Sequence, residues 1–433
     1  MKGFRVSTVV SHIDWASQFG NWGEVGVQRI IDKCVSAGIS RIYWRAFGGG
    51  LAMYQSRLES IWHASDVERF GHKVDYDALL SPGARSQWGR PTARHAKFDY
   101  RTWDPLECAV RYCRERDVEI IVWYTLNEED HGYIGLLSRF AQEHPEYAWV
   151  ARDGTVRFTN VSFGFPEVRS HKRAILRELL DYGIDGVLLD FIRRAGRFRV
   201  LGEKMVYFPY YWDDDGVCQY GYERPIVEAF RAQTGRDPFQ IPNSDEQWIR
   251  FRAGYNTLML QELRQETRHQ PKFDFSVLVF PPAVLDPEGK MYAYGDGLNQ
   301  SALNTPPGLY NNLRAALLDV ETWGREKLAD AICPMISPHY TTTGIWRSRP
   351  EAIVPEGSEL RRQIGEGVEL RIGVYCYSTD AEHMEAVFRQ TAELGADELI
   401  LFETTPLQMA GHGMGGGMWP KLWELVHEYQ PRA

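Results

Sequence analysis

The amino-acid sequence predicts a single (β/α)8 barrel, and three observations lead to this prediction. First, eight short apolar segments divide the chain, at residues 5–11, 41–46, 119–124, 186–191, 274–280, 331–337, 370–375 and 398–402. Second, most of these segments are separated by a plausible helix, and strands that alternate with helices form parallel sheets with right-handed crossovers. Third, no Gly-x-Gly-x-x-Gly motif opens the first helix, which disfavours a dinucleotide-binding sheet. Eight repeats favour a closed barrel over an open sheet.

The connections between these elements are uneven in length. The intervening helices are clearest at residues 23–37, 105–116, 166–182, 381–394 and 419–429, and the helix-to-strand turns at 182–185 and 394–397 are tight. Three strand-to-helix connections carry long insertions, near residues 47–102, 195–245 and 281–308. Long loops that follow the C-terminal ends of strands are typical of a substrate-binding barrel. We therefore predict one barrel domain over residues 1–433, with its ligand site at that end.

Composition and charge exclude several classes of protein. The chain is 44% hydrophobic and 25% charged, with a net charge of −9 and scattered basic residues. Because the net charge is negative and the basic residues are scattered, we expect no nucleic acid as a partner. Because the chain has no run of about 18 apolar residues, we expect no membrane as a partner. The N-terminal residues lack a secretory signal, and the six cysteines form no Cys-x-x-Cys pair. We expect buried thiols and a cytoplasmic location, and the sequence does not predict an oligomeric state.

The fourth apolar segment ends in a carboxylate. Residues 187–189 are apolar and run directly into Asp190, which is followed by Arg193 and Arg194. An acid at the C-terminal tip of a buried parallel strand occupies a typical catalytic position, because the scaffold fixes the acid while loops admit the substrate. The alternative is an ion pair with one of the two arginines that closes the top of the barrel. The position favours an enzyme.

Cleavage of a glycosidic bond requires a second carboxyl group. Glu403 directly follows the last strand, across the predicted barrel from Asp190, although it would also suit a rim salt bridge or a hydrogen bond to a sugar hydroxyl. Glu128 follows the third strand, where it could protonate a leaving group. Together with Glu129 and Asp130, however, it also resembles a solvated acidic turn. Glu403 is therefore the first candidate and Glu128 the reserve.

Other polar and aromatic residues cluster at the predicted strand ends. Such convergence is typical of a pocket for a polar ligand, and aromatic faces stack on sugar rings. The residues expected to bind hydroxyls or an anionic group are His12, Arg45, Arg193 and His339, and those expected to form stacking walls are Trp44, Trp123, Tyr124, Tyr340 and Tyr375. The sequence has no His-x-His or His-Glu-x-x-His signature, so we expect no metal site and no cofactor.

Three runs of residues resemble a known family. His-Pro-Glu stands at 144–146, Pro-Glu-Val-Arg at 166–169 and Asp-Gly-Val-Leu-Leu-Asp-Phe-Ile-Arg at 185–193. In this order they resemble the glycosyl-hydrolase-like family 10 proteins, with Phe191 in place of the usual Tyr. The resemblance covers about residues 118–196. It implies a glycoside-hydrolase-like barrel with Asp190 in the cleft, and it matches Asn127 to an Asn that family members carry at the third strand.

The sequence therefore predicts a glycoside hydrolase that acts on an oligosaccharide or glycoside. Asp190 is expected to be the nucleophile or base, and Glu403 the general acid. Two alternatives remain open. One is a metal-dependent sugar isomerase or epimerase, since barrels host that chemistry as well. The other is a non-catalytic carbohydrate-binding barrel, because no second acidic residue stands beside Asp190 where many members of the resembled family carry one. The sugar and its linkage stay open.

Overall fold

The computed structural model of the chain describes most but not all residues. The described residues are 3–11, 23–48, 50–59, 103–129, 138–191, 198–201, 204–207, 213, 217–282, 284, 313–336, 338–340, 346–376, 380–404 and 418–430. For residues 198–201, 204–207, 338–340 and 346 the description is limited to the backbone.

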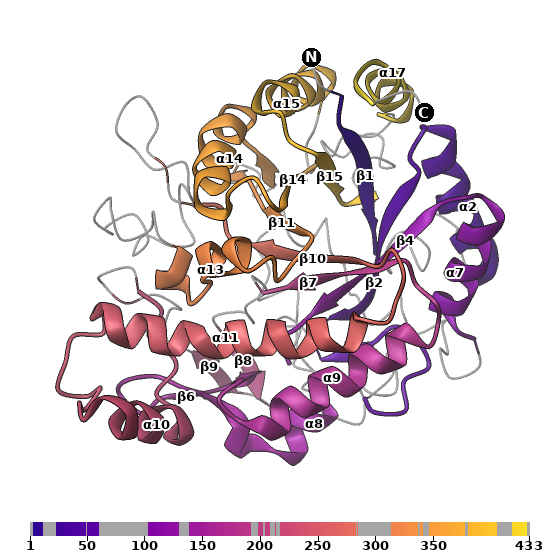
Figure 1. Ribbon diagram of the computed structural model, residues 1–433. Helices are drawn as coiled ribbons and strands as arrows, with labels where there is room; N and C mark the ends of the chain where they lie inside the picture. The colour runs from indigo at the N-terminus through magenta and orange to yellow at the C-terminus, as the bar shows by residue number, and fades with distance from the viewer. Residues whose placement is uncertain are drawn as a thin grey trace.

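Eight parallel strands form a closed barrel at the centre of the molecule (Figure 1). In chain order they are β1 (Arg5–Val10), β2 (Arg41–Gly48), β4 (Glu119–Thr125), β7 (Gly186–Asp190), β10 (Asp274–Val279), β11 (Ala331–Pro334), β14 (Glu369–Tyr375) and β15 (Glu398–Phe402). The first strand pairs in parallel with both β15 and β2, and this double pairing closes the barrel. The predicted fold class and all eight predicted strands are confirmed.

A helix follows each barrel strand and packs on the outside of the barrel (Figure 1). In chain order the helices are α2 (Gly23–Ser36), α7 (Pro105–Glu115), α9 (Pro166–Leu180), α11 (Glu246–Thr267), α13 (Val320–Arg325), α14 (Pro350–Ile364), α15 (Ala381–Leu394) and α17 (Trp419–Tyr429). The five helices expected from the sequence are all present, to within two residues at their ends. The tight turn before β15 is also present, where Gly395 ends α15 with φ of 69°, a conformation that glycine adopts without steric cost.

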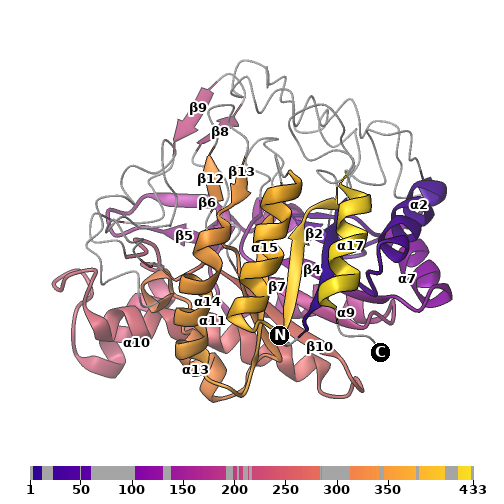
Figure 2. The same cartoon turned by 90° about the horizontal axis from the view of Figure 1, so that it is seen from above.

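The remaining elements lie in the long strand-to-helix connections. They are β3 (Leu51–Ala52), α8 (Arg139–Glu143), η1 (Pro145–Tyr147), the hairpins β5 (Ala148–Val150) with β6 (Val156–Val161), β8 (Phe198–Leu201) with β9 (Lys204–Tyr207) and β12 (Pro338–Tyr340) with β13 (Trp346–Ser348), α10 (Arg224–Thr234) and η2 (Leu313–Ala316). Figure 2 shows β8–β9 and β12–β13 at the end of the barrel opposite to the N-terminus. Because β1 begins near the N-terminus, this is the end at which the barrel strands finish.

Side chains that alternate along the strands form two apolar cores. One core lies between the strands and the helices, and the other lies inside the barrel. Successive residues of a strand point to opposite faces, so each strand contributes to both. In β7, for example, Leu189 joins the outer core and Leu188 the inner one. This alternation decides which side chains at the strand ends face the barrel interior.

All six cysteines are buried and none forms a disulfide, as expected from their spacing. Within the described part of the chain, no helix combines the length and the apolar character that are needed to cross a membrane.

Candidate active site at the C-terminal end of the barrel

Asp190 is the last residue of β7 and is fully buried on the inner side of the barrel. Its Oδ2 accepts a hydrogen bond of 2.9 Å from Trp123 Nε1, which projects from the neighbouring strand β4. In the parallel ladder Asp190 lies level with Thr125, the last residue of β4. A rigid strand thus holds this carboxylate at the end of the barrel where the long connections begin.

Trp123 has contacts on several sides. Its side chain belongs to the inner core and is only 1% exposed. The guanidinium carbon of Arg45, at 2% exposure, lies 4.9 Å from the ring centroid, which is the geometry of a cation–π contact. The ring of Phe402 meets it edge-on, with centroids 5.5 Å apart. A tryptophan enclosed in this way does not present a face to a sugar, so its expected place in a stacking wall is wrong.

Glu403 follows β15, joined to Phe402 by a cis peptide bond, and is 5% exposed. Its Oε2 accepts a hydrogen bond of 3.2 Å from Ser11 Oγ, at the end of β1. In the closed strand order, β14, β11 and β10 separate β15 from β7 on one side, and β1, β2 and β4 separate them on the other. The two carboxylates therefore belong to opposite walls of the barrel, and the contact between Phe402 and Trp123 crosses between those walls.

The segment after β4 begins next to Asp190, since the backbone N–H of Leu126 donates to the Asp190 carbonyl at 3.2 Å, and it contributes further polar groups at this end of the barrel. Glu128 is 4% exposed, and its backbone pairs with Asn160 of β6. Asn127 is 1% exposed, and its carbonyl oxygen accepts a hydrogen bond of 2.9 Å from Asn160 Nδ2. Neither polar atom of the Asn127 side chain has a hydrogen-bond partner in the described part of the chain. A buried amide of this kind is suited to a ligand, since it offers one acceptor and two donor hydrogens.

The solvated acidic turn considered for residues 128–130 is wrong for the two residues that the structure describes. Glu129 is fully buried and forms an ion pair with Lys172 of α9, which is also fully buried. Its backbone N–H donates to the carbonyl of Thr159 at 2.9 Å. Glu129 therefore ties the β4 connection to the helix layer and is not available as an acid. Asp130 lies outside the described residues.

Two other predicted stacking residues point away from the site. Trp44 lies in the outer core, and Tyr124 does so as well, donating its hydroxyl to the carbonyl of Lys172 at 3.1 Å. The reason is strand alternation, because their neighbours Tyr43 and Trp123 take the inner side. Both assignments to the stacking wall are corrected.

Of the predicted aromatic residues with described side chains, only Tyr375 is partly buried against the inner core, at the end of β14. His339 and Tyr340 stand in β12, paired with Arg347 and Trp346 of β13, and only their backbone is described. His12 and Arg193 lie outside the described residues. Among the residues that are described, no three His, Cys, Asp or Glu side chains gather in a group that could hold a metal ion.

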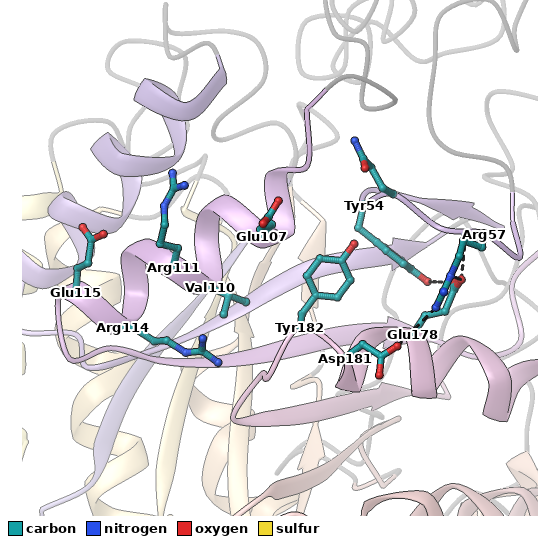
Figure 3. A pocket seen from close by; sticks show the side chains of 11 residues that line it. Tyr54, Arg57, Glu107, Val110, Arg111, Arg114, Glu115, Glu178, Asp181 and Tyr182 are labelled. Atoms are coloured by element: carbon teal, nitrogen blue, oxygen red, sulfur yellow. Dashed lines mark hydrogen bonds and ion pairs between the residues drawn. The ribbon is translucent and has the colours of Figure 1, made fainter.

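A groove of about 700 Å³ lies elsewhere, along α7 and the end of α9 on the outside of the barrel (Figure 3). No motif in the sequence indicates this groove. Its acid Glu178 accepts hydrogen bonds from Tyr54 Oη at 3.1 Å, Ser56 Oγ at 2.6 Å and the backbone N–H of Arg57 at 2.8 Å. The carboxylate thus serves to fasten the segment after β3 to α9, and the candidate active site remains at the barrel end.

Comparisons with known proteins agree with the fold. Neither a protein-family model nor a curated protein sequence matches this chain. The catalytic domain of the β-amylase from Paenibacillus polymyxa is similar in structure, with a TM-score of 0.58 at 10% identity and coverage of 99% of both chains. The PgaB (BpsB) glycoside hydrolase domain from Bordetella bronchiseptica has a TM-score of 0.53 at 12% identity, covering 99% of this chain and 100% of its own. The class that this likeness defines is the (β/α)8 barrel, and at such identities the likeness extends to the fold alone.

Proposed function

We propose that this protein is a glycoside hydrolase in which Asp190 is the nucleophile or base. The observation that carries the proposal is the placement of Asp190, which is fully buried on the inner side of the barrel at the end of β7 and held by Trp123. A carboxylate fixed by a strand end in this way keeps its geometry while the surrounding loops bind different sugars. Two further observations support the proposal. The fold is similar to that of glycoside-hydrolase barrels, and three runs of the sequence resemble the glycosyl-hydrolase-like family 10 proteins.

The second carboxylate in this proposal is Glu403. Both retaining and inverting glycosidases place their two carboxyl groups on either side of the scissile bond. Glu403 belongs to the wall opposite Asp190, whereas Glu128 follows β4, the strand adjacent to β7. Glu403 is therefore better placed as the general acid that protonates the leaving group, and Glu128 stays the reserve.

We assign substrate binding to other polar and aromatic residues that the sequence places at or after the ends of the barrel strands. The side-chain amide of Asn127 would bond to a sugar hydroxyl, and Tyr375 would stack on a ring. His12, Arg193, His339 and Tyr340 remain proposed contacts for hydroxyls, an anionic group or a ring. Arg45 lies over the ring of Trp123, so we do not propose it as a direct contact of the ligand.

The test is turnover of a panel of aryl glycosides and oligosaccharides by the wild type and by Asp190→Asn, Glu403→Gln and Glu128→Gln. We expect kcat/KM to fall about 10³-fold in Asp190→Asn and Glu403→Gln, because each removes a proton-transfer or nucleophilic group. Exogenous azide should partly restore Asp190→Ala if the mechanism is retaining. The exposed Glu246→Gln variant is the control. Native activity in Asp190→Asn overturns the assignment, and tight binding of oligosaccharides by a wild type without turnover indicates a carbohydrate-binding barrel.

Asn127→Ala should raise KM roughly three- to tenfold and change kcat little, because a hydrogen bond made equally to the bound substrate and the transition state is lost. Steady-state kinetics on any substrate found in the panel measures this effect. An unchanged KM would remove Asn127 from the site.

A further inference from the structure

The contacts of Trp123 point to a function other than sugar stacking. Its indole Nε1–H donates to Asp190, its ring face lies against Arg45, and the ring of Phe402 packs against it edge-on. With 1% of its surface exposed, the side chain is part of the barrel interior. It thus connects the strand that bears Asp190 with the strand that leads to Glu403.

The indole N–H is a donor and never an acceptor. A hydrogen bond of 2.9 Å from such a donor fixes the orientation of the Asp190 carboxylate and favours its ionised form. Both effects are stronger inside the barrel than in water, because the surroundings screen charge weakly. A nucleophile or general base requires a fixed orientation and acts as the ionised carboxylate.

Arg45 lies over the face of the indole, and Gly48 leaves the space for Arg45. The guanidinium over the ring face attracts the π system and fixes the tilt of the ring. A Cβ atom at residue 48 would stand 2.6 Å from Arg45 Nη2 and 2.8 Å from Arg45 Nε, closer than real contacts allow. Glycine at this position of β2 therefore leaves the space that the guanidinium occupies.

We propose that Trp123 is a positioning residue for Asp190, and that Arg45, admitted by Gly48, holds Trp123 in place. The proposal rests on the assignment of Asp190 as nucleophile or base. Trp123 acts through Asp190 rather than on the substrate, so its loss should affect kcat and its pH dependence more than KM.

The first test does not depend on activity. Protein labelled with ¹⁵N-tryptophan gives one indole N–H resonance for each tryptophan, and Trp123→Phe identifies that of Trp123 by its disappearance. We expect this resonance to lie downfield in the wild type and to move upfield in Asp190→Asn, because the charged acceptor is lost. The same position in both proteins would overturn the proposal, whatever the reaction of the enzyme.

The second test uses the pH profile of kcat/KM on a substrate of the wild type. Trp123→Phe keeps an aromatic ring but removes the donor, so kcat should fall roughly 10- to 100-fold with KM nearly constant, and the acid limb should move to higher pH. Gly48→Ala should move the limb in the same direction, but by less. The matched control is Trp248→Phe, which alters a fully buried tryptophan of α11 that packs on Phe230.

The outcomes separate the two proposals. A raised KM with an unmoved acid limb in Trp123→Phe would show that Trp123 is a substrate-stacking residue and would overturn the positioning role. If the wild type turns over no glycoside while the indole resonance responds to Asp190→Asn, the hydrogen bond stands and the hydrolase assignment fails.

Discussion

Burial sets the ionisation of one acidic side chain, Glu223, which directly precedes α10. It is 1% exposed, and its Oε1 accepts a hydrogen bond of 2.8 Å from the backbone N–H of Val150. It lines a cavity of about 30 Å³ together with Arg252. Burial raises the pKa of the Glu223 carboxyl to about 7, although the bond from Val150 opposes the change. The folded protein therefore retains a proton here that the unfolded chain loses at a lower pH.

This difference predicts a pH dependence of stability. The pKa of Glu223 rises on folding from 4.5 to about 7, so wild-type stability falls as the pH rises through this window. Glu223→Gln keeps the size of the side chain and cannot ionise. Its stability relative to the wild type should rise by up to roughly 3 kcal/mol between pH 4.5 and pH 8, as measured by urea unfolding. A difference that does not vary with pH would contradict the prediction.

Helix α15 illustrates how one residue defines the start of an element. Asp380 is its N-cap, and its Oδ1 accepts a hydrogen bond of 2.7 Å from the backbone N–H of His383. This bond lowers the pKa of the Asp380 carboxyl, against the opposing effect of desolvation. The associated stability is therefore present above the unfolded pKa and is lost as the pH falls through the folded pKa. In the sequence, the start of this helix is indicated by an aspartate directly before an amphipathic segment.

Replacement of Asp380 by alanine should lower the free energy of unfolding by about 1 kcal/mol, because one backbone N–H of the first turn loses its partner. Asp380→Asn retains a capping oxygen and is the matched control, with an expected loss of a few tenths of a kcal/mol or less. Urea unfolding at neutral pH gives both values. Equal losses in the two variants would mean that capping is not the cause.

Helices α14 and α11 were not among the helices expected from the sequence, and each has a physical reason for its weak sequence pattern. Pro355 lies inside α14. A proline in a helix interior removes a backbone N–H, so in a sequence it normally predicts the end of a helix. Packing of α14 against the neighbouring helices outweighs this local cost. In α11, polar and apolar residues do not separate cleanly, because salt bridges such as Arg169–Glu262 and Arg173–Glu266 join it to α9.

An ionic network closes the barrel at the end opposite the candidate site. Glu398, at 2% exposure, accepts hydrogen bonds from Ser7 Oγ at 2.5 Å, Arg41 Nη1 at 2.9 Å and Tyr43 Oη at 3.0 Å. Arg371 Nε lies 3.3 Å from its Oε2. These groups come from β1, β2, β14 and β15, so the network holds together strands from both ends of the chain.

Asp274 extends this network to β10. Burial by itself would raise the pKa of its carboxyl, but Arg371 and Arg41 outweigh burial and hold the pKa below its ordinary value. The charges in the barrel floor are thus mutually compensated, which is the condition for keeping ions in an interior.

Glu398→Gln should lower the free energy of unfolding by roughly 3–5 kcal/mol, because it leaves Arg41 and Arg371 buried with less opposite charge. The control is Glu246→Gln, which breaks an exposed ion pair with Arg250 and should cost less than about 1 kcal/mol. Urea unfolding monitored by circular dichroism compares the two. A loss for Glu398→Gln no larger than that of the control would refute a stabilising role for the network.

The sequence by itself determined the barrel, because apolar segments with tight helix-to-strand turns encode strands and crossovers locally. It also placed Asp190 and Glu403 at strand ends on opposite walls, since strand order in such a barrel follows chain order. The catalytic roles, the substrate and the cytoplasmic location remain predictions.

Only the tertiary structure decided which side chains face one another. Residue types at a strand end do not show which face they occupy, so the sequence alone predicts the wrong side for Trp44 and Tyr124. The bond between Ser11 and Glu403 joins residues 392 positions apart, a contact that no local pattern encodes. For the same reason the sequence alone predicts a sugar-stacking role for Trp123, whereas the closed barrel brings its indole N–H against Asp190.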